Sequence, residues 1–435
     1  MQIVMDELLN RILKRSGSMF AEDLAVHRTD IEARVRGARV LVIGAAGSIG
    51  SAFVKQLLPF RPAGLHLVDI SENNLVEVVR DLRSSLVFMP NDFKTFAVAM
   101  GSLEFNRMLA EEGPYDYVVN FSAMKHVRSE RDPFSLMRMM HTNVEAVKEL
   151  LDRLSGTATK KHFSVSSDKA ANPANIMGAT KIFMERILLA WSDRLPFSTA
   201  RFANVAFSDG SLLYGFLKRL EKRQPFSAPY DVKRYFISHE ESGQLCLLAC
   251  FLGENRDVYF PKLDESKDVL TFSEIAVMVL AAHGLEPDLC ASEEEAKEKA
   301  KLIRDRAPII IPGVSASAPL VEDAAKALNR EIGALSLIKK NIWPCYFFAS
   351  DTTGEKPFEE FYTAADRVDF ERYRQVGVIS QPPWTDRERI DGALAAFEAI
   401  RRAPHWRKED MVEAIRIIVP ELEHEEKGKN LDQKM

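Results

Sequence analysis

The sequence predicts an α/β fold in which a parallel sheet carries helices on both faces. Strand-like apolar runs alternate with helical patterns from about residue 37 to residue 205. A glycine-rich turn, GAAGSIG, separates the first run from the first helical pattern, and an aspartate ends the second run. This alternation is typical of doubly wound sheets, because a crossover between parallel strands needs a helix. We therefore expect a Rossmann-type sheet, with a smaller substrate-binding lobe and helical additions at both ends.

The expected elements follow one another as strand and helix pairs. Strands are expected in RVLVIG, GLHLVDI, TFAVAM, YDYVVNFSA, KHFSVSS and FSTARFANV. Helices are expected from Ser48, from Glu72, from Leu103, over 143–154 and over 178–191. Together these elements form the expected nucleotide-binding domain, residues 37–205.

The two ends of the chain are expected to add to this domain. Residues 1–36 are amphipathic and predict an N-terminal helical arm outside the core. Residues 206–435 are expected to form the substrate lobe and a C-terminal helical tail, interleaved with the first domain. The sequence does not indicate a function for an insertion at about 287–345. The charge pattern at its start, 287–307, predicts a helix that is exposed to solvent.

Composition excludes several classes of protein. The chain has 58 basic and 63 acidic residues in 435, without a lysine or arginine block, so we expect no nucleic-acid partner. Charged residues interrupt the first twenty positions and no run approaches about 18 apolar residues, so a cytoplasmic protein without a membrane span is expected. The four cysteines lack metal-ligand spacing and are expected to be buried free thiols, with no metal site.

The glycine-rich turn predicts a dinucleotide site. Gly44, Gly47 and Gly50 stand between a strand and a helix, where glycines let a pyrophosphate approach backbone amides; Ser48 and Ile49 begin that helix. Asp69 follows at the spacing of a carboxylate that binds the adenosine ribose, and it would repel a 2′-phosphate, so NAD rather than NADP is expected. The alternative is that Asp69 only caps the next helix, although Ser71 is the better cap.

Four further segments carry a family resemblance. These are NFSAMKHV (120–127), TNVEA (142–146), SVSSDKAANPANIMGATK (164–181) and RFANV (201–205). In this order they resemble the extended short-chain dehydrogenase/reductases, and more narrowly the UDP-N-acetylglucosamine 4,6-dehydratases and related capsule and glycan biosynthesis proteins. The resemblance runs from about Arg39 to Leu263 and resumes at 352–361. It implies a nucleotide-sugar substrate, hydride removal from carbon-4, loss of water across carbons 5 and 6, and hydride return to carbon-6.

The resemblance also implies roles for single residues. Lys181 would hold the nicotinamide ribose, Ser167 would contact the carbon-4 oxygen, and Asp168 and Lys169 would act as acid and base at carbons 6 and 5. Further cofactor contacts are expected from Ser102, which stands where relatives carry an adenine-binding aspartate, and from Ser122 and Ala123. Substrate contacts are expected from Lys125, His126, Asn204, Arg234 and Glu355, the last with Lys356, while Asn143 would order a group near Lys181.

Two alternatives concern the catalytic residues. The tyrosine usual four residues before the lysine is Met177 here, which cannot transfer a proton. This matches a subgroup of the dehydratases, but it would also fit an inactive sugar-nucleotide-binding protein. Asp168 and Lys169 could instead be an ordinary solvated surface pair. A 4-epimerase on the same fold is the other alternative.

A homo-oligomer, at least a dimer, is expected from the apolar positions of one helix. Val144, Val147, Leu150 and Leu151 would suit a helical interface between subunits. The same stripe would also result if the helix only covered the sheet of its own chain.

Overall fold

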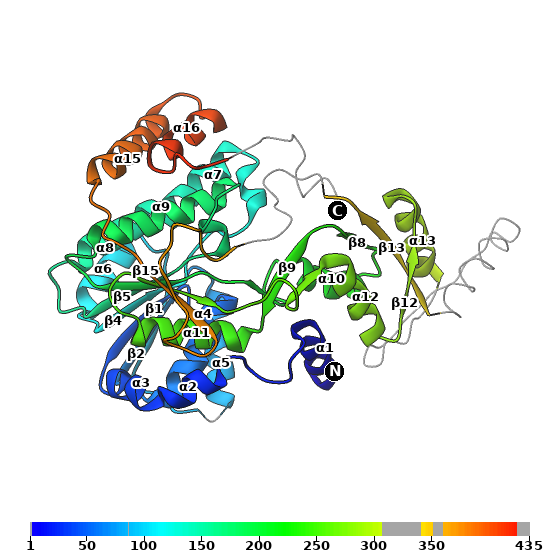
Figure 1. Cartoon of the computed structure of the whole chain (residues 1–435), viewed down its shortest axis with the longest axis horizontal. Coiled ribbons are helices and arrows are strands. Elements are labelled where there is room, and N and C mark those ends of the chain that lie inside the picture. Colours follow the sequence, from blue (N-terminus) through cyan, green and yellow to red (C-terminus); the bar gives the residue numbers. More distant parts are fainter. Residues whose placement is uncertain (1, 86, 307–340, 351–359, 424–435) are drawn as a thin grey trace, which may run out of the picture.

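A computed structural model describes residues 2–85, 87–306, 341–350 and 360–423 (Figure 1). Within these residues the main sheet has nine strands in the order β14-β15-β10-β6-β5-β4-β1-β2-β3. Seven strands, from β3 to β10, are parallel, and β15 and β14 add antiparallel at one edge. The strands are β1 (Arg39–Ile43), β2 (Gly64–Asp69), β3 (Asp92–Ala97), β4 (Tyr117–Asn120), β5 (Lys161–Val165), β6 (Phe197–Ala200), β10 (Asp257–Pro261), β14 (Val368–Asp369) and β15 (Val376–Ser380). The expected doubly wound sheet is confirmed.

Helices cover both faces of this sheet because its central strands are apolar on both sides. Val40 and Val42 of β1 face one core, and Leu41 and Ile43 face the other. The first core includes α3 (Arg28–Val35), α4 (Ser48–Leu57), α5 (Glu72–Ser84) and α11 (His239–Leu252). The second includes α6 (Leu103–Glu112), α7 (Pro133–Met140), α8 (Ala146–Leu154), α9 (Ile176–Trp191), α15 (Arg387–Arg402) and α16 (Lys408–Ile418).

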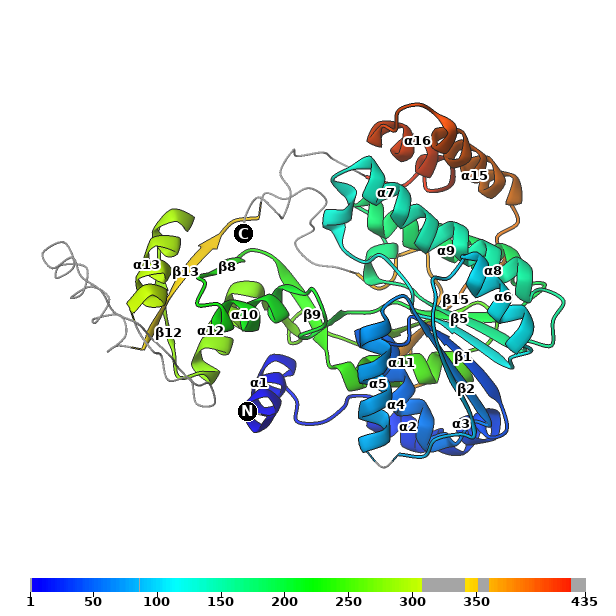
Figure 2. The same ribbon diagram turned by 180° about the vertical axis from the view of Figure 1, so that it is seen from behind.

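A small lobe extends from one end of the sheet (Figure 2). A three-stranded parallel sheet runs through it in the order β12-β13-β8. Its strands are β8 (Phe226–Pro229), β12 (Glu286–Leu289) and β13 (Ile342–Phe348), and its helices are α10 (Leu212–Glu221), α12 (Phe272–Ala282) and α13 (Glu293–Arg306). A second small sheet is formed by β7 (Asn204–Val205), β9 (Lys233–Ile237) and β11 (Val269–Thr271), in the order β11-β9-β7. Its strand β9 lies between the lobe and the main sheet in Figure 2.

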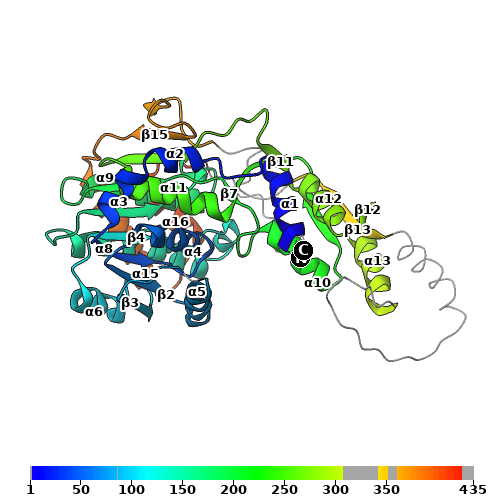
Figure 3. The same ribbon diagram turned by 90° about the horizontal axis from the view of Figure 1, so that it is seen from below.

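The N-terminal helices were expected to lie outside the core, but they contribute residues to two of the cores. Helix α1 (Gln2–Leu13) lies against the small lobe, beside α12, and buries Leu8 and Ile12 in the lobe's core (Figure 3). Residues from α2 (Ala21–Val26) and α3 and the turn before them reach the main sheet, where Phe20 and Ile31 are fully buried. The sequence does not indicate this packing, because the apolar stripe of an amphipathic helix does not reveal which surface it will contact.

The expected helix over 287–307 begins later than the charge pattern suggests. Its first residues form β12, which pairs with β13, and α13 starts at Glu293. The paired residues of β12 and β13, such as Glu286 and Ile342, are 56 positions apart (342 − 286), so no local pattern could indicate this pairing. The helix is also only partly solvated, since Ala296, Ala300 and Ile303 are buried.

The apolar stripe around α8 packs inside this chain. Val144, Val147, Leu150 and Leu151 are at most 1% exposed and belong to the second core. Helix α16 packs against α7 and α9 of the same core. The interpretation that the stripe covers its own sheet is therefore confirmed, and the dimer stays a prediction without support from these residues.

Two further expectations concern cysteines and membranes. Cys246, Cys250, Cys290 and Cys345 are free and buried, as expected. None of the helices within the described ranges combines the length and the apolar character needed to cross a membrane.

A close approach of helices α4 and α11 at Gly243 tests the packing of the first core. A Cβ atom at Gly243 of α11 would lie 2.6 Å from the carbonyl oxygen of Ala52 in α4, whereas nothing lies within 4 Å of one at Gly215 in α10. Gly243→Ala should therefore lower the free energy of unfolding by about 1–3 kcal/mol, measured by denaturant titration, because backbone must move. Gly215→Ala is the control and should be neutral or stabilising by up to ~1 kcal/mol. Equal effects of the two substitutions would contradict this packing.

Candidate functional site

The glycine-rich turn joins the carboxyl end of β1 to helix α4 through close backbone contacts. Gly44 has φ +72°, and a Cβ atom there would lie 2.6 Å from the backbone nitrogen of Ser122, after β4. A Cβ at Gly50 would lie 2.1 Å from the carbonyl oxygen of Gly44. Both positions therefore require glycine. Gly47 is the N-cap of α4, where no side chain within the described residues caps the helix, so its first amides suit an anion.

Asp69 ends β2 and holds the glycine-rich turn. Its Oδ2 accepts the backbone N–H of Ala46 at 3.0 Å, and its Oδ1 accepts that of Ser71 at 2.9 Å. Ser71 caps α5, since its hydroxyl accepts the N–H of Asn74. Asp69 is thus not the cap of α5, and its partly exposed carboxylate stands beside the turn.

The other residues at the start of α4 make contacts within the protein. Ile49 packs on the first core. Ser48 exchanges hydrogen bonds with Asp209, because its hydroxyl accepts the Asp209 N–H at 3.1 Å and lies 3.3 Å from the Asp209 carboxylate. The loop after β7 therefore reaches the beginning of α4, a contact that the sequence analysis missed.

The loop after β4 is fixed by two buried asparagines. Asn120 accepts the Ser122 N–H at 2.9 Å, which orients the segment that includes Ala123. Asn143 accepts the N–H of Met124 at 2.8 Å and donates to the hydroxyl of Thr180 in α9 at 2.9 Å. It lies in a single π-helical turn, η3 (His141–Glu145), a feature often found at functional sites. Asn143 therefore ties this loop to the helix that carries Lys181.

Ser167, Asp168 and Lys169 follow β5 and form one hydrogen-bonded cluster. Asp168 Oδ1 accepts the Ser167 hydroxyl at 2.8 Å, the Lys169 N–H at 2.9 Å and the Lys169 ammonium at 3.1 Å. The two charged side chains are only 4% and 18% exposed, respectively. The alternative of a solvated surface pair is therefore wrong for these two residues.

Helix α9 brings Lys181 to the same strand end. Its ammonium donates to the carbonyl oxygen of Val165, the last residue of β5, at 3.0 Å. Burial lowers the pKa of Lys181 to about 8, against the opposing charge of Glu185. The helix can approach the Lys169 loop because a Cβ at Gly178 would lie 2.5 Å from the Lys169 carbonyl oxygen. The structure thus brings together four of the residues proposed from the sequence.

Met177 is buried in the first turn of α9 beside an unexpected carboxylate. Its N–H donates to Oε1 of Glu130 at 2.6 Å, while the N-cap Asn175 accepts the N–H of Gly178. Glu130 ends the short helix η2 (Val127–Glu130) and is 4% exposed. A negative charge at a helix N-terminus is favourable. The loop that carries Lys125 and His126 is therefore anchored to α9 through Glu130.

The other residues expected to contact cofactor or substrate lie outside the β5 cluster. Burial, with the charges of Lys125 and Arg128, lowers the pKa of His126 to about 4, so its ring is neutral at pH 7. The His126 ring lies against the loop at Gly210.

Ser102 is the N-cap of α6, and its hydroxyl accepts the N–H of Phe105. Asn204 lies in β7 and Arg234, buried, in the neighbouring β9, and no hydrogen bond or ion pair in the described residues joins either to the β5 cluster. Glu355 and Lys356 lie outside the described residues.

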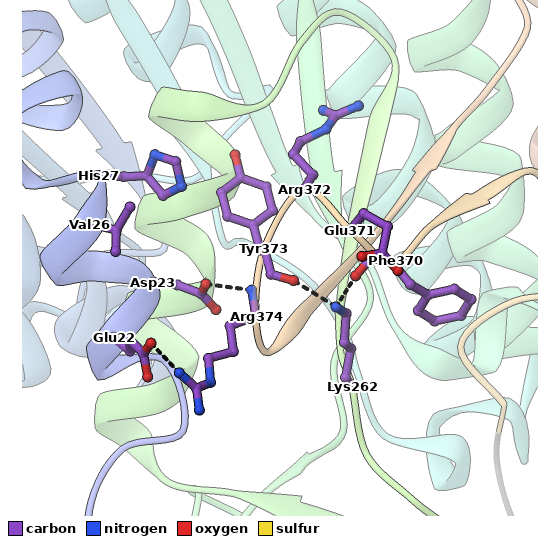
Figure 4. A pocket seen from close by; sticks show the side chains of 10 residues that line it. All are labelled: Glu22, Asp23, Val26, His27, Lys262, Phe370, Glu371, Arg372, Tyr373 and Arg374. Atoms are coloured by element: carbon purple, nitrogen blue, oxygen red, sulfur yellow. Dashed lines mark hydrogen bonds and ion pairs between the residues drawn. The ribbon is translucent and has the colours of Figure 1, made fainter.

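A hollow of about 400 Å³ lies between α2 and the segment before β15 (Figure 4). Its polar groups bind one another: Asp23 accepts the N–H of Arg374 at 2.6 Å, and Lys262 donates to the Tyr373 carbonyl oxygen at 2.6 Å. It includes none of the residues proposed from the sequence. These contacts join α2 to the segment before β15 at the edge of the sheet.

The strand-end cluster can perform acid–base chemistry. A carboxyl group and an amine hydrogen-bonded at 3.1 Å can exchange a proton, and the partly exposed Ser167 hydroxyl stands beside them. The uncapped start of α4 lies at the same edge of the sheet, because β1, β4 and β5 are parallel neighbours. An anion site and an acid–base cluster therefore share one edge, where doubly wound sheets bind ligands.

Three proteins illustrate what the chain resembles. An uncharacterized membrane protein of Methanocaldococcus jannaschii is 30% identical over 60% of this chain and 77% of its own. An inverting UDP-N-acetylglucosamine 4,6-dehydratase of Campylobacter jejuni is 26% identical over 58% of this chain and 72% of its own. The X-ray structure of Pen from Bacillus thuringiensis superposes with a TM-score of 0.57 at 19% identity, over 80% of this chain and 90% of that one, and supports the fold.

Some relatives are matched over less than half of their own length. Polysaccharide biosynthesis proteins of Bacillus subtilis and Staphylococcus aureus are matched over only 44% and 38% of their length. The sequence profile described as polysaccharide biosynthesis protein matches residues 40–303, which contain the glycine turn and the strand-end cluster. The family resemblance seen in the sequence is thereby confirmed, and this chain belongs to the polysaccharide biosynthesis protein family.

Proposed function

We propose that the protein is a nucleotide-sugar 4,6-dehydratase that uses NAD, with UDP-N-acetylglucosamine as the first substrate to test. The observation that carries the proposal is the hydrogen-bonded Ser167, Asp168 and Lys169 cluster at the end of β5, with Lys181 bound to the same strand end. An acid and a base held together suit the removal of water across adjacent carbons. The likeness to a relative named a UDP-N-acetylglucosamine 4,6-dehydratase supports the choice of substrate.

The glycine turn fits a dinucleotide. Side chains at Gly44 or Gly50 would collide with backbone, so the turn stays narrow and its amides accessible to a pyrophosphate. Asp69, partly exposed beside the turn, would accept the adenosine ribose hydroxyls, which favours NAD over NADP. When bound, NAD supplies a hydride acceptor that returns the hydride within the same turnover. Lys181 would bind the nicotinamide ribose.

The elimination can be assigned to the cluster with its protons balanced. Transfer of the shared proton from Lys169 to Asp168 converts the ion pair into an amine and a carboxylic acid. Lys169 then takes the carbon-5 proton, and Asp168 gives its proton to the departing carbon-6 hydroxyl, which leaves as water. The pair ends as it began, as an ammonium and a carboxylate. Ser167 would hydrogen-bond the carbon-4 oxygen.

Mass spectrometry of the product tests the proposal. Purified protein is incubated with NAD and with UDP-N-acetylglucosamine, followed by other UDP-, GDP-, CDP- and dTDP-sugars. The expected product is lighter than its substrate by one water. A product of unchanged mass but altered configuration would indicate the epimerase activity named for other relatives. Binding of a nucleotide sugar without any conversion would indicate an inactive binding protein.

Substitutions in the cluster should separate catalysis from cofactor binding. Asp168→Asn and Lys169→Ala should each lower kcat by about 10²–10⁴-fold with NAD affinity nearly unchanged, because positioned proton transfer contributes a factor of this size. The exposed pair Asp264 and Lys267, 3.5 Å apart, gives the matched controls Asp264→Asn and Lys267→Ala, which should retain wild-type turnover. Near-wild-type turnover in both cluster variants would refute the roles assigned to Asp168 and Lys169.

Met177 offers a test of catalysis without a tyrosine. If the thioether only shapes the pocket, Met177→Ala should retain measurable turnover. In Met177→Tyr, the ammonium of Lys181 would lower the pKa of the new phenol, so turnover should persist or rise. Steady-state rates of the two variants and the wild type check this. An inactive wild type together with an active Met177→Tyr variant would identify a binding protein that has lost its base.

A further inference from the structure

Beneath the strand-end cluster lies a fully buried ion pair that the proposed reaction does not use. Arg201 follows β6, and its guanidinium donates to both carboxylate oxygens of Glu185 in α9, at 2.7 and 3.1 Å. The two residues are 2% and 3% exposed. Such two-point pairing fixes both side chains in one orientation.

The pair connects three segments around the site. The hydroxyl of Ser166, the residue before the cluster, donates to the Glu185 carboxylate. Arg201 also donates to the carbonyl oxygen of Phe361 at 2.8 Å and lies 3.9 Å from the carboxylate of Asp366. The end of β5, helix α9 and the segment from Phe361 to Asp366 are therefore joined at one point.

Glu185 is also the charge that acts on Lys181. The two residues lie one helical turn apart on α9, and the Glu185 charge raises the pKa of Lys181 against the larger effect of burial. Several other charged groups surround this region. Arg201 and Asp366 approach through the ion pair, and Glu130 binds the Met177 amide from η2. Asp168 and Lys169, after β5, bind each other.

Stability alone gives a weak reason to keep this pair. Desolvation of two buried charges offsets much of their attraction, and apolar residues of similar volume often serve the fold equally well. An apolar pair could not accept the hydrogen bond from Ser166, and it would carry no charge to raise the pKa of Lys181.

We propose that Glu185 is a positioning residue: paired with Arg201, it keeps Lys181 in its charged form for cofactor binding and holds Ser166 so that the catalytic cluster is correctly placed. The inference rests on the proposed function. It predicts two separable effects, one on cofactor binding and one on turnover.

The binding effect is measured as NADH affinity across neutral and alkaline pH, from NADH fluorescence, which needs no turnover. Affinity that depends on charged Lys181 is present below the pKa of this lysine and lost above it, so the wild-type midpoint should lie near pH 8. Glu185→Gln keeps the acceptor oxygen but removes the charge that raises this pKa. The midpoint should therefore move down by about one pH unit.

Glu241→Gln is the matched control. Glu241 is 1% exposed and pairs with Arg15 through both oxygens, at 2.7 Å each, at the start of α11. The same substitution there should leave the NADH midpoint in place. Should Glu185→Gln not fold, the double variant Glu185→Met with Arg201→Met removes both charges. A smaller downward shift is then expected, because the lost positive charge of Arg201 partly offsets the lost negative charge of Glu185.

The turnover effect is tested with Ser166→Ala, which leaves the ion pair intact. This variant should lower kcat for the dehydration at least several-fold without moving the NADH midpoint. A wild-type midpoint in a folded Glu185 variant, or an equal shift in Glu241→Gln, would overturn the inference while the dehydratase proposal stands. Failure of the wild type to bind NADH would instead overturn the proposed function, and this inference with it.

Discussion

The contact between the glycine turn and the loop after β4 is the constraint on which the site depends. In the parallel register, Ile43 of β1 lies beside Asn120 of β4, and Asn120 lies beside Ser164 of β5. The three chain segments that leave these strands must therefore share one edge. At Gly44 the turn comes so close to Ser122 that no side chain fits between them. This contact fixes the turn before α4 against the loop after β4, and β4 is the neighbour of the strand that carries the Ser167, Asp168 and Lys169 cluster.

Helix α9, which carries Lys181, is held in its first turn from several directions. The side chains of Asn175 and Glu130 accept hydrogen bonds from two of its first backbone N–H groups. Asn143 donates a hydrogen bond to Thr180, and at Gly178 the absence of a side chain lets the Lys169 loop pack directly on the helix backbone. A helix end whose amides are satisfied in this way cannot shift easily. The ammonium of Lys181 is therefore placed at the end of β5 although burial opposes its charge.

The described segments near both ends of the chain extend the two cores of the main sheet. Phe20 and Ile31 extend the first core, and α15 and α16 extend the second over α7 and α9. Strands β15 and β14 continue the sheet beyond β10 in the antiparallel direction.

The sequence by itself determined what depends on neighbouring residues. The alternating apolar runs predicted the sheet, and GAAGSIG predicted the turn before α4. Ser71 was recognised as the cap of α5, and Ser167, Asp168 and Lys169 were expected at the end of the strand KHFSVSS. Tertiary structure decided the burial of the N-terminal helices, the pairing of β12 with β13, and the contacts of Glu130 with Met177 and of Glu185 with Arg201. Glu185 and Arg201 are 16 positions apart in the sequence, and the paired residues Glu286 of β12 and Ile342 of β13 are 56 positions apart (342 − 286). Local propensity cannot specify such partners, because a buried charge or an apolar stripe requires a partner but does not reveal which one the fold supplies.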